Sequence, residues 1–178
     1  STVSGVFPKK FRSKILGAEK KGEYWASGIS VVAHMKNPKI PALHFNTRYI
    51  VTTKEWFGGG MDATPSYQDS KEKKLLHRML KNVCIQNKKN YSKYKKWCDN
   101  YFYLPHRNET RGIGGIFFDY EIDNWIKNFK FVRELGLTFI EITNKVIKRK
   151  KETKWLKKDK EKQLLKRGRY AEFNLLYD

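Results

Sequence analysis

Two stretches in the first third of the chain are rich in apolar and β-branched residues and are separated by a proline-containing break. The first stretch runs from Gly28 to Met35, and the second, in which apolar and polar residues alternate, runs from Leu43 to Val51. The break between them is Asn37–Pro41. Alternation with a period of two is typical of strands, so the pattern predicts two strands joined by a turn that proline fixes.

The next stretches change from strand-like to helix-like spacing. Trp56–Asp62 predicts a strand that runs into a glycine-rich bend, and Thr64-Pro65 predicts a loop after it. Apolar residues at helical spacing predict a helix over Lys71–Val83. A second helix is predicted from the same spacing of Tyr91, Tyr94, Trp97, Cys98, Tyr101 and Phe102.

The last third continues this alternation of strands and helices. Gly112–Tyr120 predicts a strand, Ile122–Val146 a helix with one apolar side, and the lysine-rich segment after it another helix. The end of the chain, Arg167–Asp178, predicts a final strand. Short connections between the first strands leave no room for parallel crossovers. We therefore expect an α+β fold with a mainly antiparallel sheet.

Length, charge and cysteine content narrow the class of protein. A chain of 178 residues with 39% hydrophobic residues is sufficient for one domain, which we expect to span residues 1–178. Its net charge of +20 predicts attraction to anions, without indicating which ones. Cys84 and Cys98 lack the spacing of a zinc or disulfide motif, which favours a reducing, cytoplasmic setting. No apolar run is long enough for a membrane span.

Polar residues recur at alternate positions of the first two predicted strands. In a strand, alternate side chains share a face, so Ser30 and His34 share one face, and His44, Asn46 and Arg48 share another. Such a stripe suits an anionic, hydrogen-bonding ligand, although an ordinary exposed sheet face is an equal alternative.

Two glycine runs lie beside charged residues. Gly58–Gly60 is followed by Asp62, and Gly112–Gly115 is preceded by Arg111. Neither run has the spacing of a P-loop or a dinucleotide fold, so a nucleotide site is disfavoured. The runs are consistent with tight turns, while the adjacent charges favour a position facing a ligand. The segment Asn90–Trp97, in which basic and aromatic residues alternate, leaves an RNA-binding module as an alternative.

Six segments closely resemble the signatures of the oxygen-dependent coproporphyrinogen III oxidases, and they occur in the family's order. The segments are Gly28–His34, His44–Arg48, Trp56–Pro65, Tyr94–Asp99, His106–Asp119 and Arg167–Asn174. The resemblance implies a large, flat antiparallel sheet flanked by helices on both sides, and a homodimer. It also implies that family members have further sequence at both ends, so we expect this chain to be truncated at each.

The same resemblance implies an activity and a set of site residues. The activity is oxidative decarboxylation of two propionates of coproporphyrinogen III by O2, in haem biosynthesis, with no organic cofactor and no nucleic acid partner. By this resemblance, the family's substrate-binding positions correspond to Ser30, Asn46, Thr47 and Arg48, and its proton donor corresponds to His44. Candidate ligands for a divalent metal match His34, His44, His77 and His106. An inactive relative that keeps the fold is a further alternative.

Two roles are our own assignments within this picture. Asp62 is the carboxylate expected to hold a pyrrole N–H of the substrate, with Arg48 and Arg111 as clamps for propionates. Asp119 is expected to lie outside the site. Because the four histidines are spread widely along the sequence, we do not expect all of them to meet at one ion.

Overall fold

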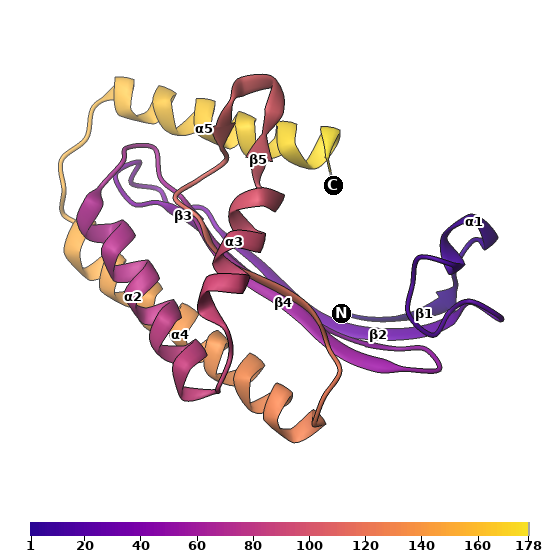
Figure 1. Ribbon diagram of the computed structural model, residues 1–178. Coiled ribbons are helices and arrows are strands. Elements are labelled where there is room, and N and C mark those ends of the chain that lie inside the picture. The colour runs from indigo at the N-terminus through magenta and orange to yellow at the C-terminus, as the bar shows by residue number, and fades with distance from the viewer. Residues whose placement is uncertain (178) are drawn as a thin grey trace.

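The computed structural model describes residues 1–177 and has an α+β architecture, as predicted (Figure 1). A five-stranded, fully antiparallel sheet has the order β1-β2-β3-β4-β7. Its strands are β1 (Thr2–Val6), β2 (Glu23–Ala33), β3 (Ala42–Val51), β4 (Glu55–Thr64) and β7 (Gly115–Glu121). A separate two-stranded pair consists of β5 (Tyr103–Leu104) and β6 (Glu109–Thr110). The helices are α1 (Lys9–Arg12), α2 (Ser70–Gln86), α3 (Tyr91–Tyr101), α4 (Trp125–Lys150) and α5 (Lys157–Leu176), with a 3-10 turn at Pro105–Arg107.

Helices α2 and α4 cover one face of the sheet and form the main core with it. Phe45 of β3 stacks on Phe139 of α4 with ring centroids 5.2 Å apart. Gly136 faces the same phenylalanine, since a methyl group there would lie 3.4 Å from the Phe45 ring. Burying each such side chain contributes about 1.5–3 kcal/mol. The apolar stripe read from the sequence of α4 therefore faces the sheet.

Helix α3 packs along the edge of β7 and reaches both faces of that strand. Its Tyr94 packs against Phe118 on the side of α2 and α4, while Tyr101 stacks on Phe117 on the opposite side. The other edge of the sheet is β1, in which every residue is exposed. The two edges of the sheet thus differ: α3 covers the edge at β7, whereas the edge at β1 is exposed.

The final strand predicted at Arg167–Asp178 is wrong, because this segment belongs to helix α5. Asp178 lies outside the described residues. Between Lys157 and Leu176 there is no β-branched residue, and lysine, leucine, arginine and glutamate favour a helix. Helix α5 crosses the face of the sheet opposite α2 and α4, where Tyr170 meets the ring of His44. Helices therefore lie on both sides of the sheet, as expected.

The predicted turn at Asn37–Pro41 is confirmed, and it does more than join β2 to β3. The side-chain amide of Asn37 donates to the carbonyl oxygens of Lys150 at 3.2 Å and Thr153 at 2.9 Å. Lys150 is the last residue of α4, where backbone acceptors have no partner within the helix, and Thr153 lies just beyond this end. One turn thus caps a helix that is more than a hundred residues away in sequence.

Two strand boundaries and two further elements differ from the expectations. Strand β4 continues through Thr64, so Asp62 lies within a strand and not on a bend. Strand β2 begins at Glu23, and β1 and α1 had not been predicted.

Within residues 1–177, no helix is both long and apolar enough to cross a membrane.

Candidate active site

The strand register brings the predicted polar stripe together on the face opposite α2 and α4. His44, Asn46 and Arg48 of β3 pair with Asp62, Gly60 and Gly58 of β4, respectively. Ser30 of β2 pairs with Asn46 from the other side. Directly paired residues in antiparallel strands point to the same face. His44, Asn46, Arg48 and Ser30 therefore form one surface, as the alternation indicated.

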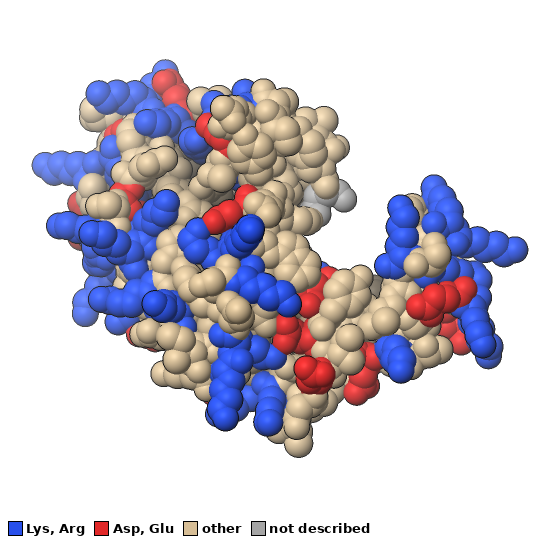
Figure 2. Space-filling view, in the orientation of Figure 1, with Lys and Arg blue, Asp and Glu red and all other residues tan. Residues whose placement is uncertain are grey.

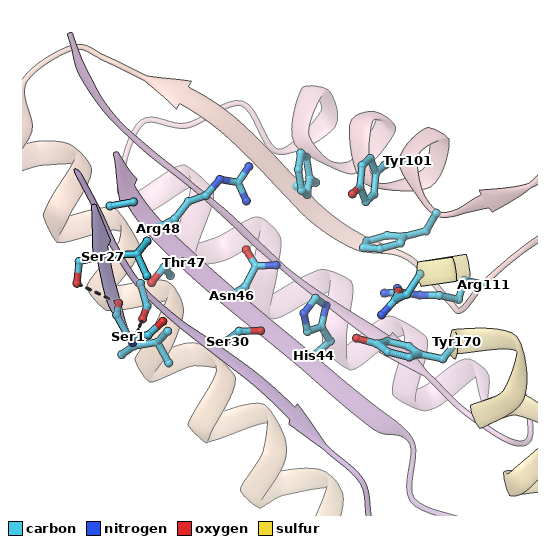
Figure 3. Close-up of a pocket in the computed structure, with 17 residues that line it drawn as sticks. Ser1, Ser27, Ser30, His44, Asn46, Thr47, Arg48, Tyr101, Arg111 and Tyr170 are labelled. Atoms are coloured by element: carbon cyan, nitrogen blue, oxygen red, sulfur yellow. Dashed lines mark hydrogen bonds between the residues drawn. The ribbon is translucent and has the colours of Figure 1, made fainter. Parts of the chain in front are cut away.

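This surface is the floor of a cavity of about 630 Å³, a volume typical of small-molecule sites (Figure 3). The cavity extends from the start of β1 to helix α5. The predicted site residues that line it are Ser30, His44, Asn46, Thr47, Arg48 and Arg111. Asp62 does not line it, although it lies directly beside His44.

The glycines of β4 keep the middle of this floor free of side chains. A methyl group on Gly58 would lie 2.4 Å from a carboxylate oxygen of Asp119, and one on Gly60 would lie 2.6 Å from the carbonyl oxygen of Ile116. Both distances are far below van der Waals contact. Side chains from β3 and β7 can therefore meet across β4, which a larger residue would prevent.

The Arg48–Asp119 ion pair uses this free space. Arg48 Nη2 donates to Asp119 Oδ2 at 2.7 Å, and Trp56 Nε1 donates to Asp119 Oδ1 at 3.1 Å. The Arg48 side chain remains 33% exposed and borders the cavity. Asp119 was expected to lie outside the site, but it fixes the arginine that the cavity exposes.

A second ion pair lies beneath the other end of the floor. His44 Nδ1 donates to Asp62 Oδ1 at 2.8 Å, and Arg111 Nη2 donates to Asp62 Oδ2 at 2.7 Å. The side chain of Asp62 is only 4% exposed and that of Arg111 only 1%. Burial raises the pKa of the Asp62 carboxyl, but the charge of Arg111 and the hydrogen bond from His44 outweigh burial and hold this pKa below its ordinary value.

Aromatic rings surround the buried guanidinium of Arg111. Its Cζ lies 3.6 Å from the ring centroid of Phe102, 4.5 Å from that of Tyr170 and 5.1 Å from that of Phe173. The Nε of Arg111 is buried and has no hydrogen-bond partner among the described residues. Arg111 is therefore held inside the protein by Asp62 and the rings, which differs from the exposed propionate clamp expected from the sequence.

Asn46 carries an unsatisfied acceptor at the centre of the floor. Its Oδ1 is buried and has no hydrogen-bond partner among residues 1–177, yet the residue borders the cavity. A buried acceptor without a donor costs about 1–3 kcal/mol. A ligand that presents an N–H or O–H group to Asn46 would remove this cost.

The four histidines that the resemblance implies as metal ligands do not fit a shared metal site. His77 uses both ring nitrogens, towards the Tyr91 hydroxyl and the carbonyl oxygen of Ile113. His106 also uses both, towards Tyr177 and Glu172. The rings of His34 and His44 each lie against the ring of Tyr170. No three His, Cys, Asp or Glu side chains of the described chain are grouped to hold a metal ion.

Several residues of the cavity were missed from the sequence. Tyr101, Phe117, Tyr170 and Asn174 line it, and Asp119 supports Arg48. Tyr170 and Asn174 belong to a segment that carried the family resemblance, but interpreting it as a strand concealed their position. The alternation of Phe117 with Asp119 in a predicted strand was a usable signal, since both side chains point to the cavity face.

The large positive charge of the chain lies mainly away from the cavity. Both arginines at the floor are paired with carboxylates, Arg48 with Asp119 and Arg111 with Asp62. Figure 2 shows lysines and arginines gathered over the outer side of α2 and α4 and around α1, whereas mostly uncharged residues border the hollow between α5 and the α1 arm. On this face of the molecule, the lysines and arginines that contribute to the net charge of +20 therefore lie mainly away from the hollow.

Comparisons with known proteins agree with the geometry. The family model described as coproporphyrinogen III oxidase matches residues 1–178. An oxygen-dependent coproporphyrinogen-III oxidase of Rickettsia akari (strain Hartford) is 49% identical over 180 residues, covering 100% of this chain and 64% of that protein. The enzyme of the same name from Rickettsia typhi (strain Wilmington) is 51% identical with the same coverage. The chain thus spans 64% of the length of these curated relatives. It belongs to the coproporphyrinogen III oxidase family.

Proposed function

We propose that the protein containing this chain catalyses the oxidative decarboxylation of two propionates of coproporphyrinogen III. For each propionic acid group, one O2 accepts two electrons and two protons from the substrate to become H2O2, while the side chain loses CO2 and becomes a vinyl group. The family match and the relatives' printed names support this reaction over an RNA-binding module or an inactive relative.

The observation that carries the proposal is the unsatisfied Asn46 Oδ1 on a floor that the glycines of β4 keep flat. A porphyrinogen presents pyrrole N–H donors near its centre and carboxylates at its rim. The N–H groups would satisfy Asn46, while the exposed part of the Arg48 guanidinium lies where a rim carboxylate would reach it. One ligand would thus match both features.

His44 is the residue we assign to proton transfer at the substrate. It lines the cavity, and its Nδ1 is bonded to Asp62, which leaves Nε2 for the ligand. Asp62 does not reach the cavity, because both carboxylate oxygens are engaged and the side chain is buried. We therefore revise its role from pyrrole-binding carboxylate to a residue that orients His44, with Arg111 holding Asp62 in turn.

The chemistry then divides between the substrate and these side chains. Oxygen reacts with the electron-rich pyrrole, and the electrons of the reaction come from the substrate itself. The protein positions the ring system on the floor, holds carboxylates at Arg48, and moves a proton at His44 Nε2.

Aerobic turnover tests the proposal directly. Full-length protein is incubated under air with coproporphyrinogen III, and protoporphyrin is followed by fluorescence after oxidation of the product. We expect product to form with release of CO2, and to be absent when O2 is removed. A full-length, folded protein that leaves the substrate unchanged under air would contradict the proposal.

Gly58→Ala should weaken substrate binding through the Arg48–Asp119 pair. The added methyl group would lie 2.4 Å from Asp119 Oδ1 and 3.0 Å from Arg48 Nε, so the carboxylate must move and release the arginine. We expect KM to rise about tenfold, equivalent to about 1.4 kcal/mol, with kcat changed less. Asp119→Asn removes the same pair and should raise KM in the same direction. An unchanged KM in both variants would exclude this role for the pair.

We also propose that the full-length protein is a cytoplasmic homodimer. The buried, unpaired thiols of Cys84 and Cys98 are consistent with a reducing compartment. Apolar side chains that remain exposed on β2 and α4 support burial against another surface, with Ile29 60% and Ile140 54% exposed. Light scattering on the full-length protein should give twice the monomer mass, and a single monomeric species would contradict the dimer.

A further inference from the structure

Tyr170 of α5 contacts both ends of the buried chain of charged groups beside the cavity. Its ring centroid lies 4.5 Å from the guanidinium carbon of Arg111 and 6.3 Å from the imidazole centroid of His44, with the latter rings nearly perpendicular at 82°. Figure 3 shows the labelled Tyr170 beside both residues. We propose that Tyr170 is a positioning residue that keeps His44 in its working orientation, an inference that rests on the proposed function.

The contacts form a closed ring of four side chains. His44 bonds to Asp62 at 2.8 Å, and Asp62 pairs with Arg111 at 2.7 Å. Arg111 in turn lies against the Tyr170 ring, which returns to His44. A closed ring restrains each member from two sides. His44 is thus held both at Nδ1, by Asp62, and at its side, by Tyr170.

Aromatic contacts hold the part of the Arg111 guanidinium that hydrogen bonds do not. Nη2 bonds to Asp62, but the buried Nε has no hydrogen-bond partner in the described part of the chain. The Phe102 and Tyr170 rings are within 3.6 and 4.5 Å of Cζ. Contacts between a cation and a desolvated aromatic ring are stabilising. Losing the Tyr170 ring would leave the guanidinium free to tilt away from Asp62.

The ring of Tyr170, and not its hydroxyl, carries this role. All the contacts to Arg111, His34 and His44 are made by the ring. Phenylalanine at position 170 should therefore preserve the role of Tyr170, whereas leucine or methionine should not. This difference separates positioning by an aromatic ring from hydrogen bonding by a phenol.

The test uses the full-length protein with Tyr170→Phe, Tyr170→Leu and Tyr170→Met. We expect Tyr170→Phe to retain kcat within about twofold, and the other two to lose about 10- to 100-fold, as is usual for groups that orient a reacting residue. Binding of coproporphyrin III, the oxidised ring that cannot react, should change by less than about threefold in fluorescence titrations. Tyr177→Leu, at the end of the same helix and against His106, is the matched control and should keep normal kcat.

A double variant gives the sharpest readout. Because Asp62 and Tyr170 are both proposed to act through the orientation of His44, Tyr170→Leu should lower kcat little further in a protein that already carries Asp62→Asn. Additive losses, a parallel loss of coproporphyrin binding, or an equal loss in Tyr170→Phe would overturn the inference. Methionine fills space without an aromatic ring and provides the comparison if the leucine variant does not fold. Failure of the wild-type protein to turn over would instead refute the proposed function.

Discussion

Asp62→Asn is expected to lower both turnover and stability strongly. The amide keeps the size of the carboxylate but presents an N–H to one of its two partners, His44 or Arg111, and removes the charge that Arg111 needs. Turnover should fall at least about a hundredfold, because His44 loses its orientation and tautomer. The free energy of unfolding should fall by about 3–5 kcal/mol, because a buried guanidinium is left without its counterion.

The expected loss of stability follows from where Asp62 lies in the fold. A carboxylate on an exposed bend could be neutralised at little cost to stability, but Asp62 is 3% exposed within β4. Turnover by full-length protein and urea unfolding would measure the two effects separately. Asp159→Asn is the matched control: Asp159 is also buried and paired with Lys39, outside the cavity. It should lose stability and keep its turnover. Near-normal turnover of Asp62→Asn would limit Asp62 to a structural role.

Gly115→Ala is expected to disrupt the sheet beside the same carboxylate. A methyl group at Gly115 would lie 1.9 Å from the carbonyl oxygen of Met61 and 2.7 Å from the Cα of Asp62. Both atoms belong to the backbone of β4, so no side chain can rotate away and the two strands must separate. We expect a loss of about 3 kcal/mol or more, at the upper end for an overpacked core.

Gly168→Ala is expected to raise the stability of the same protein. Gly168 lies within α5, and a methyl group there would meet no atom within 4 Å. Alanine should stabilise the helix by about 0.5–1 kcal/mol. The unfolding midpoints of both variants in urea would decide the comparison. If Gly115→Ala unfolded at the wild-type midpoint, the close approach of β4 and β7 would not be a constraint on this position.

The sequence predicted local elements well where spacing is regular. Alternation from Leu43 to Val51 located β3 and placed His44, Asn46 and Arg48 on one face, as the register confirms. Helix α2, predicted over Lys71–Val83, was recovered for the same reason. These elements are determined by periods of two and 3.6 residues, which neighbouring residues alone define.

Contacts between site residues that are distant in the sequence could not be predicted from this local spacing. Arg48 and Asp119 are separated by 71 positions, and their contact depends on the order of β3, β4 and β7 in the sheet. The burial of Asp62 likewise depends on Arg111 and on α5, whose second half, from Arg167, had been interpreted as a strand. Local patterns define faces, but they do not specify which faces meet. The family resemblance named Ser30, His44, Asn46, Thr47 and Arg48, all of which line the cavity, but not their partners.

The unequal edges of the sheet restrict how it can grow. Side chains of α3 lie on both faces of β7 and close that edge, whereas β1 is exposed along its whole length and, among residues 1–177, pairs only with β2. An open edge is a template for another strand. Any strand added to this sheet, from the same polypeptide or another one, must therefore add beside β1. Growth there would extend the wall of the cavity that Ser1 and Val3 begin.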